Sequence, residues 1–152
     1  MIQCTLEYIM YPRKNEYKPD DYIIGQFTTN ASNVPDKFRN GKKNGKIIFT
    51  GKGIGIPTER KFDVLLEGKW NMNDKYGLEM FVDKSDIVLP SDETGIKLYL
   101  TRFLAGCGPR SADKIYKRFG PNTLFVLNNT PEKLFEVKGI REKQVQKMID
   151  SF

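Results

Sequence analysis

The amino-acid sequence predicts an α+β protein in which a small β-barrel domain, residues 1–90, precedes an all-α domain, residues 91–152. Apolar residues alternate with polar ones before Pro90, but they recur at helical spacing after Ser91. Turn-forming residues divide the first part into short segments, whereas the second part repeats itself after 33 residues. A chain of 152 residues has room for one domain or two small ones.

Five segments with β character make up the first domain. In residues 4–10 we expect the even positions to face the core: Cys4, Leu6, Tyr8 and Met10. Four further segments are rich in β-branched and aromatic residues: 22–29, 46–50, 61–70 and 78–82. The last two flank a turn with a glycine near its end, 71–77, which predicts a hairpin. Short strands separated by turn residues favour a small closed or partly open barrel.

The segment 30–45 differs from its neighbours because it has no periodic apolar face. Its basic residues lie beside one aromatic residue, Phe38: Lys37, Arg39, Lys42 and Lys43. One interpretation is a solvated loop. The other is a loop that faces a nucleic acid and offers one aromatic ring for stacking.

Helical spacing begins after Ser91. The first helix is expected to bury the face formed by Ile96, Leu100, Phe103 and Leu104. Residues 91–94 carry the signals for its start. A second helix, 111–119, ends at Gly120, and a short element covers 124–127. Thr130 followed by proline predicts a helix start with a hydroxyl cap. The last helix is expected over 142–152.

The helical domain contains an internal repeat with an offset of 33 residues, which places Gly106 on Gly139. The same offset pairs the apolar positions: Leu104 with Val137, Ala112 with Val145, Ile115 with Met148, and Phe119 with Phe152. Two helix–turn–helix units are therefore predicted.

Each predicted turn has the chemistry of a phosphate site. Glycines let a ligand approach the backbone, and the helix that follows offers unpaired N–H groups at its positive end. The candidate DNA-binding residues are Gly106, Gly108, Arg110, Ser111, Lys114, Lys138, Gly139, Arg141 and Lys143. The alternative is that the glycines only permit close helix packing, which we favour for the second turn because Arg141 replaces a glycine there.

Composition excludes several classes of protein. The net charge is +6, and residues 91–152 carry 11 basic and 7 acidic side chains, a net +4. The chain has no histidine, which excludes histidine triads and histidine zinc sites, and its two cysteines are too few for a zinc site. No apolar run is long enough for a membrane span, so we expect a cytoplasmic protein with no membrane partner.

The stretch 104–115, followed by Phe119-Gly120, resembles a helix-hairpin-helix element. Its neighbours in sequence order are Gly68-Lys69-Trp70, Lys75-Tyr76-Gly77, Pro90, Gly95-Ile96, Tyr99-Leu100, Thr123-Leu124, Pro131, Leu134, Val137 and Gly139-Ile140. In that order they resemble the N-terminal region of RecD/TraA-type DNA helicases. The resemblance is strongest over 62–141. Cys107 stands where that family usually has an aliphatic residue.

The resemblance implies an OB-like barrel followed by tandem helix-hairpin-helix units, within an ATP-driven 5′→3′ helicase of DNA repair or recombination. It places the motor in further domains, and this chain has no Walker A sequence. We therefore expect a non-catalytic N-terminal fragment or short homologue, without a cofactor of its own, since ATP and Mg²⁺ belong to the absent domains. The expected partners are single-stranded or forked DNA and the motor domains of the same polypeptide.

Two other functions stay open. The chain could be a scaffold that braces the motor domains and binds little DNA, or a nuclease, although its aspartates show no justified cluster: Asp63, Asp74, Asp83 and Asp86. If the barrel binds DNA, the aromatic residues that could stack on bases are Trp70, Tyr76 and Phe81, although we favour a core position for each of them.

Overall fold

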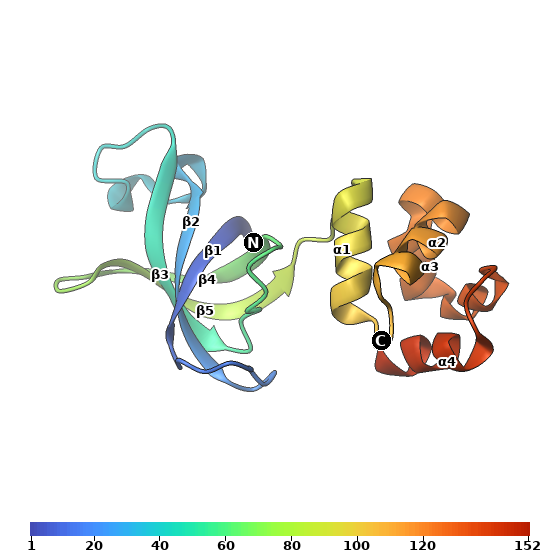
Figure 1. Cartoon of the computed structure of the whole chain (residues 1–152). Coiled ribbons are helices and arrows are strands. Elements are labelled where there is room, and N and C mark those ends of the chain that lie inside the picture. Colours follow the sequence, from blue (N-terminus) through green and yellow to red (C-terminus); the bar gives the residue numbers. More distant parts are fainter. The chain divides into compact units, whose positions relative to one another are not determined.

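The computed structural model describes residues 1–152 and divides into two compact units, Met1–Val88 and Leu89–Phe152. The first unit contains all five β-strands and the second contains all four α-helices (Figure 1). The predicted α+β class, with strands first and helices after them, is confirmed. No helix has the length and apolar character that crossing a lipid bilayer requires.

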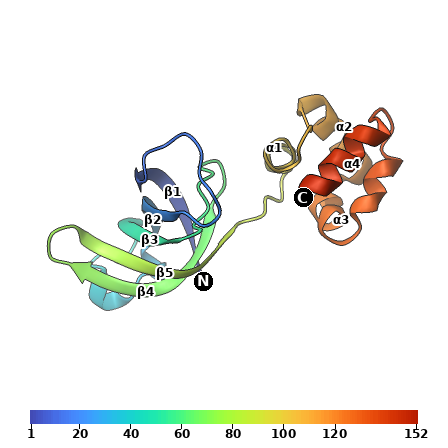
Figure 2. The same ribbon diagram turned by 90° about the horizontal axis from the view of Figure 1, so that it is seen from below.

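The first unit is a closed five-stranded barrel with the order β1-β2-β3-β5-β4. Its strands are β1 (Ile2–Tyr11), β2 (Tyr22–Asn30), β3 (Lys46–Ile54), β4 (Val64–Asn73) and β5 (Gly77–Ile87). All neighbours are antiparallel except β3 and β5, which pair in parallel. Strands β4 and β5 form a long hairpin (Figures 1 and 2), and its turn is shorter than predicted, because the strands run on to Asn73 and resume at Gly77.

The predicted inward face of β1 is only half right. Cys4 and Leu6 are buried, but Tyr8 is 44% exposed and Met10 also lies at the surface. The pairing of β1 with β2 shifts register between Leu6 and Tyr8, as at a β-bulge. One extra residue reverses which side chains face inward, so Ile9 packs against the core instead.

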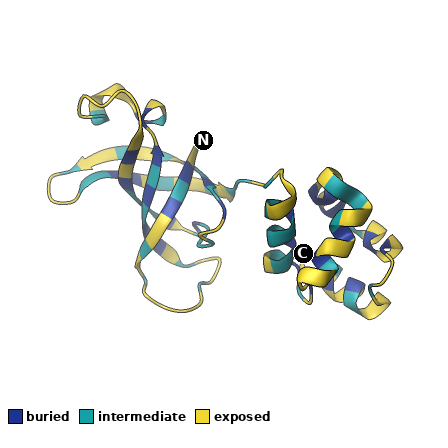
Figure 3. Cartoon of the chain, turned by 45° about the horizontal axis from the view of Figure 1, so that its top comes forward, coloured by how far each residue is buried: buried dark blue, intermediate teal, exposed yellow.

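The centre of the barrel is filled by the ring of Phe27, which is fully buried and stacks with Phe49 at 5.7 Å between centroids. Gly25 and Gly51 lie directly opposite each other on β2 and β3. A Cβ atom added to Gly51 would lie 2.8 Å from the Phe27 ring, and one added to Gly25 would lie 3.0 Å from it. The two glycines therefore leave the space that the ring occupies. Figure 3 shows buried and exposed residues alternating along these strands.

The segment between β2 and β3 is ordered rather than a simple solvated loop. It contains two 3₁₀ turns, Ala31–Asn33 and Asp36–Phe38, over a small cluster of buried residues: Ala31, Val34 and Ile47. Phe38 packs against this cluster, so its ring contributes to the fold. The side chain of Arg39 donates a 2.6 Å hydrogen bond to the carbonyl oxygen of Val34. The exposed basic side chains that remain are Lys37, Lys42 and Lys43.

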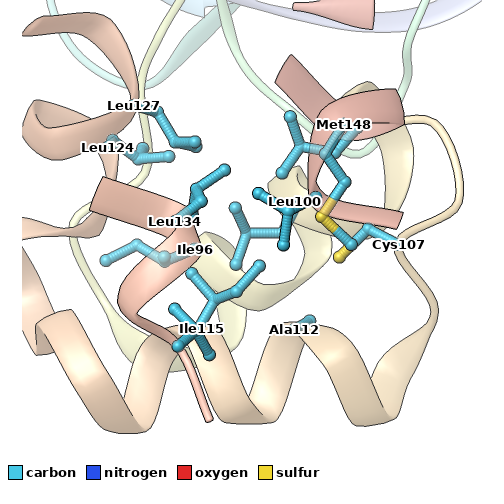
Figure 4. Packing of buried hydrophobic residues seen from close by; sticks show 12 residues of the cluster. Ile96, Leu100, Cys107, Ala112, Ile115, Leu124, Leu127, Leu134 and Met148 are labelled. Atoms are coloured by element: carbon cyan, nitrogen blue, oxygen red, sulfur yellow. The ribbon is translucent and has the colours of Figure 1, made fainter. Parts of the chain in front are cut away.

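The second unit is built from α1 (Glu93–Phe103), α2 (Pro109–Phe119), α3 (Thr123–Asn129) and α4 (Glu142–Ser151). Two 3₁₀ segments, Gly120–Asn122 and Pro131–Glu136, lie before and after α3. The helices share one apolar core (Figure 4), whose members are Ile96, Leu100, Leu104, Cys107, Ala112, Ile115, Leu124, Leu127, Leu134, Val137, Val145 and Met148.

Two helix starts were predicted from capping residues, and one of them is wrong. Asp92 caps α1, since its side chain accepts a 2.8 Å hydrogen bond from the Gly95 amide. Thr130 makes no such cap, and Pro131–Glu136 forms a 3₁₀ segment instead of an α-helix. The reason is that α3 extends to Asn129, so Thr130 is the C-cap residue that follows this helix. The Thr130 amide and hydroxyl both donate to the Val126 carbonyl oxygen.

Candidate nucleic-acid interface

Two turns in the helical unit have the same backbone form. We call residues 104–108 the first turn and residues 137–141 the second turn. Gly106 and Gly139 adopt φ angles of 76° and 86°, a region that favours glycine. The helices that follow, α2 and α4, begin one residue after each turn and 33 residues apart.

The predicted repeat is confirmed by burial at its apolar positions. Three of its residue pairs lie in the shared core: Leu104 with Val137, Ala112 with Val145, and Ile115 with Met148. The fourth pair differs, because Phe119 packs against the core whereas Phe152 is 46% exposed.

The repeats are joined by reciprocal contacts that the sequence did not predict. The Lys114 ammonium on α2 donates a 2.9 Å hydrogen bond to the Gly139 carbonyl oxygen in the second turn. Lys147 on α4 lies against Gly106 in the first turn, its Cδ 3.5 Å from the place of an added Cβ. Lys114 and Lys147 are equivalent in the repeat, so each helix carries a lysine to the other repeat's turn. The 33-residue offset was the signal that could have identified Lys147.

Ser111 takes part in the same junction between repeats. The side-chain amide of Gln144, its counterpart on α4, donates to the Gly106 carbonyl oxygen at 2.8 Å and to the Ser111 hydroxyl oxygen at 2.9 Å. The structure therefore gives Ser111 and Gln144 a role in fixing the first turn against α4.

The N-termini of α2 and α4 carry no side-chain cap. The residues at the cap positions are Gly108 and Arg141, and neither accepts a hydrogen bond from its helix through a side chain. The first amides of an α-helix have no partner within the helix, so an external acceptor can bind them. The second residue of each helix is basic and exposed, Arg110 in α2 and Lys143 in α4.

Of the two glycines in the first turn, only one has a backbone conformation that favours glycine. The positive φ of Gly106 explains why a glycine stands there. Gly108 has φ −89°, which suits any residue, and a Cβ added to it would meet nothing within 4 Å. Arg141 occupies the equivalent place before α4 with a long side chain. Neither packing nor backbone conformation therefore demands a glycine at position 108.

Basic side chains lie on the surface beside each turn. Beside the second turn, a groove of about 360 Å³ is lined by Lys114, Lys117, Arg118, Glu136 and Lys138. Beside the first turn, a shallow and open part of the surface is bordered by Ala105, Lys143, Gln146, Lys147, Asp150 and Ser151. The candidate residues are thus gathered around two turns of one unit.

Comparison with protein-family models, curated proteins and solved structures gives no match for this chain. No group of three or more histidine, cysteine, aspartate or glutamate side chains is placed to hold a metal ion.

The three aromatic residues considered for base stacking lie in different surroundings. Trp70 is partly buried and packs edge-on against Phe49, with ring centroids 5.0 Å apart. Tyr76 and Phe81 lie at the surface, and Tyr76 is 65% exposed. The expected core position is therefore right for Trp70 and wrong for Tyr76 and Phe81, and the Lys75 ammonium lies over the Tyr76 ring, 5.2 Å from its centroid.

Both cysteines are expected to be unreactive in the folded protein. Burial raises the pKa of Cys107, in the first turn, to about 11 and that of Cys4, in the barrel, to about 12. The reactive form is the thiolate, which is scarce below the pKa. At about pH 8, Ellman's reagent should therefore label neither cysteine until urea unfolds the chain. Rapid labelling of Cys107 in the folded protein would contradict its buried position.

Proposed function

We propose that this chain is a non-catalytic, DNA-binding accessory region that holds phosphates without sequence preference through its two turns. The observation that carries the proposal is the pair of equivalent helix starts, each uncapped and each followed by an exposed basic residue, Arg110 or Lys143. A phosphodiester accepts hydrogen bonds from such amides and is attracted by the adjacent cation. Such contacts position a protein on DNA but do not read bases.

We also propose a more specific fold for each unit. We describe the barrel as OB-like, since a five-stranded barrel closed by a parallel β3–β5 pair supports that assignment. We describe the two turns with their flanking helices as tandem helix-hairpin-helix units. The reciprocal contacts of Lys114 and Lys147 support two units that pack face to face.

The proposed setting is the N-terminal region of a RecD/TraA-like helicase that works in DNA repair or recombination in the cytoplasm. In that setting ATP hydrolysis belongs to motor domains outside this chain, and the turns hold single-stranded or forked DNA beside them. The sequence resemblance over residues 62–141 supports the setting.

A scaffold that braces the motor domains is the second candidate. It is favoured because some backbone polar groups of the two turns already have hydrogen-bond partners within the chain. The Ala105 amide donates to the Ser151 hydroxyl oxygen at 2.9 Å, and the Gly139 carbonyl oxygen accepts from Lys114. In this reading the turns serve to join the repeats.

Fluorescence anisotropy of labelled single-stranded and forked DNA with the full chain, across a salt series, tests the proposal. We expect binding to DNA, with a logarithm of the association constant that falls linearly with the logarithm of the salt concentration. The slope should be about 0.7 to 0.9 per phosphate neutralised. Replacing Arg110 and Lys143 by alanine should lower both the affinity and this slope.

The matched control for either single replacement, Arg110→Ala or Lys143→Ala, is Lys84→Ala in the barrel, an exposed lysine whose loss likewise removes one positive charge. It should leave the slope unchanged. Absence of binding at low salt would refute DNA binding and support the scaffold.

A further inference from the structure

The segment between β2 and β3 contains the dipeptide Asn-Gly twice, at Asn40-Gly41 and at Asn44-Gly45. No other asparagine of the chain is followed by glycine. Both dipeptides follow a basic residue and precede a lysine, and all four of their residues are exposed. A backbone amide can attack the side-chain amide of the preceding asparagine. Glycine favours this attack because it has no Cβ that hinders the approach of its nitrogen.

The groups that would react are accessible and have no partners within the chain. The backbone nitrogens of Gly41 and Gly45 donate no hydrogen bond. The side chains of Asn40 and Asn44 make none either. A Cβ atom added to Gly41 would meet nothing within 4 Å, and one added to Gly45 would meet only Cε of Lys42, at 3.5 Å. Neither hydrogen bonding nor crowding therefore keeps the two amides apart.

Asn30, the last residue of β2, provides a contrast within the same part of the chain. It is exposed as well, but the next amide belongs to the buried residue Ala31. The Ala31 nitrogen donates a 2.8 Å hydrogen bond to the Gly45 carbonyl oxygen. An attack on the Asn30 side chain would break this bond and move the Ala31 methyl group out of its buried place. Exposure is thus shared by the three asparagines, and the amide that follows each of them differs.

We propose that Asn40 and Asn44 are sites of spontaneous deamidation. The nitrogen of the following glycine forms a bond to the asparagine Cγ and loses its proton. The bond between Cγ and Nδ2 breaks, and Nδ2 takes up a proton and leaves as ammonia. The five-membered imide that remains is opened by water at either carbonyl, which gives aspartate or isoaspartate. Water is the only co-reactant, and no group is oxidised or reduced.

The reaction changes the charge of this part of the barrel unit. Residues 36–46 carry five basic and one acidic side chain, a net charge of +4. Each deamidation adds one carboxylate, so reaction at both sites halves this charge and weakens the attraction of the segment for anions. Isoaspartate also lengthens the main chain by one carbon. At Asn44 this change lies next to the Gly45 carbonyl group that the Ala31 amide holds.

The test follows the full chain during incubation at neutral pH and body temperature. Chymotrypsin cleaves after phenylalanine, so one peptide, residues 39–49, contains both sites, and another, residues 28–38, contains Asn30. Mass spectrometry with fragmentation should show the replacement of NH₂ by OH at Asn40 and Asn44, and none at Asn30. A synthetic peptide of residues 39–49 in the same buffer gives the reference rate, and the folded chain should react at a similar rate.

Cation-exchange chromatography of the intact chain measures the change in charge independently. Wild type should separate with time into the original species and two less basic ones. Asn44→Gln should give a single less basic species, because glutamine would have to close a less favourable six-membered ring. Asn30→Gln is the matched control and should behave as wild type does.

The outcomes decide the proposal site by site. A site that reacts in the synthetic peptide but stays intact in the folded chain is protected by the fold, which refutes the proposal for that site. Equal reaction at Asn30 would overturn the argument as a whole, because the free glycine amides would then not select the sites. None of these measurements uses DNA, so their results do not depend on the proposed function.

Discussion

Replacing Gly108 by asparagine is expected to weaken DNA binding about 10- to 100-fold while leaving α2 at least as stable as before. Asparagine is among the best N-cap residues, because its side-chain oxygen accepts from the amides at the start of the helix. Those amides are the ones we assign to a phosphate. A hydrogen bond to a charged group is worth about 1.5–3 kcal/mol, which corresponds to this loss of affinity.

Stability and binding should thus change in opposite directions, which a purely structural role does not produce. Thermal unfolding followed by circular dichroism reports the first quantity, and anisotropy with labelled DNA reports the second. Gly108→Ala is the matched comparison, because its methyl group meets nothing within 4 Å and cannot cap. A folded Gly108→Asn protein with wild-type affinity would show that the amides of α2 do not hold phosphate.

The largest change in stability is expected from Phe27→Ala, which should cost the barrel about 3–5 kcal/mol. Phe27 is fully buried and stacks with Phe49, and two glycines keep the space above its ring open. Trp70 is the only tryptophan of the chain and packs edge-on against Phe49. Its fluorescence during urea unfolding therefore follows the barrel without interference from the helical unit.

A double-mutant cycle tests the contact between the ring and the glycines. Gly51→Ala alone should destabilise the barrel by about 1–3 kcal/mol, since its new methyl group would lie 2.8 Å from the Phe27 ring. In a Phe27→Leu background the same substitution should cost less, because the ring is gone. Costs that simply add in the double variant would show that something other than this contact keeps position 51 a glycine.

The order of elements was predictable because it depends on short-range patterns. The change of apolar spacing near Pro90 and the 33-residue repeat both predict structure that the chain adopts. The orientation of Tyr8 was not predictable, since it depends on a register shift that arises only when β1 pairs with β2. The predicted N-cap at Thr130 is wrong for a similar reason, because the Thr130 hydroxyl donates to the Val126 carbonyl oxygen at the end of α3.

The candidate site was predictable in its chemistry and not in its assembly. Glycines and basic residues in sequence indicated both turns, but nothing local indicated that Lys114 would contact Gly139, 25 residues away. Lys147 was not among the predicted site residues because it is far from the first turn in sequence. The packing of the two repeats brings these residues together, and packing is a property of the whole unit.

The two turns share a backbone form but differ in one side chain, Gly108 in the first and Arg141 in the second. In a symmetric dimer of identical chains both positions would have to carry the same residue. A repeat within a single chain allows each half to change alone, so the two ends of this unit are chemically distinguishable. The backbone of a double helix is the same in either direction, so unequal turns give neither direction a lower free energy there. A single strand has one direction, and in the proposed function two unequal turns distinguish its 5′ side from its 3′ side. The inequality of the turns thus gives the domain a polarity that its fold alone would lack.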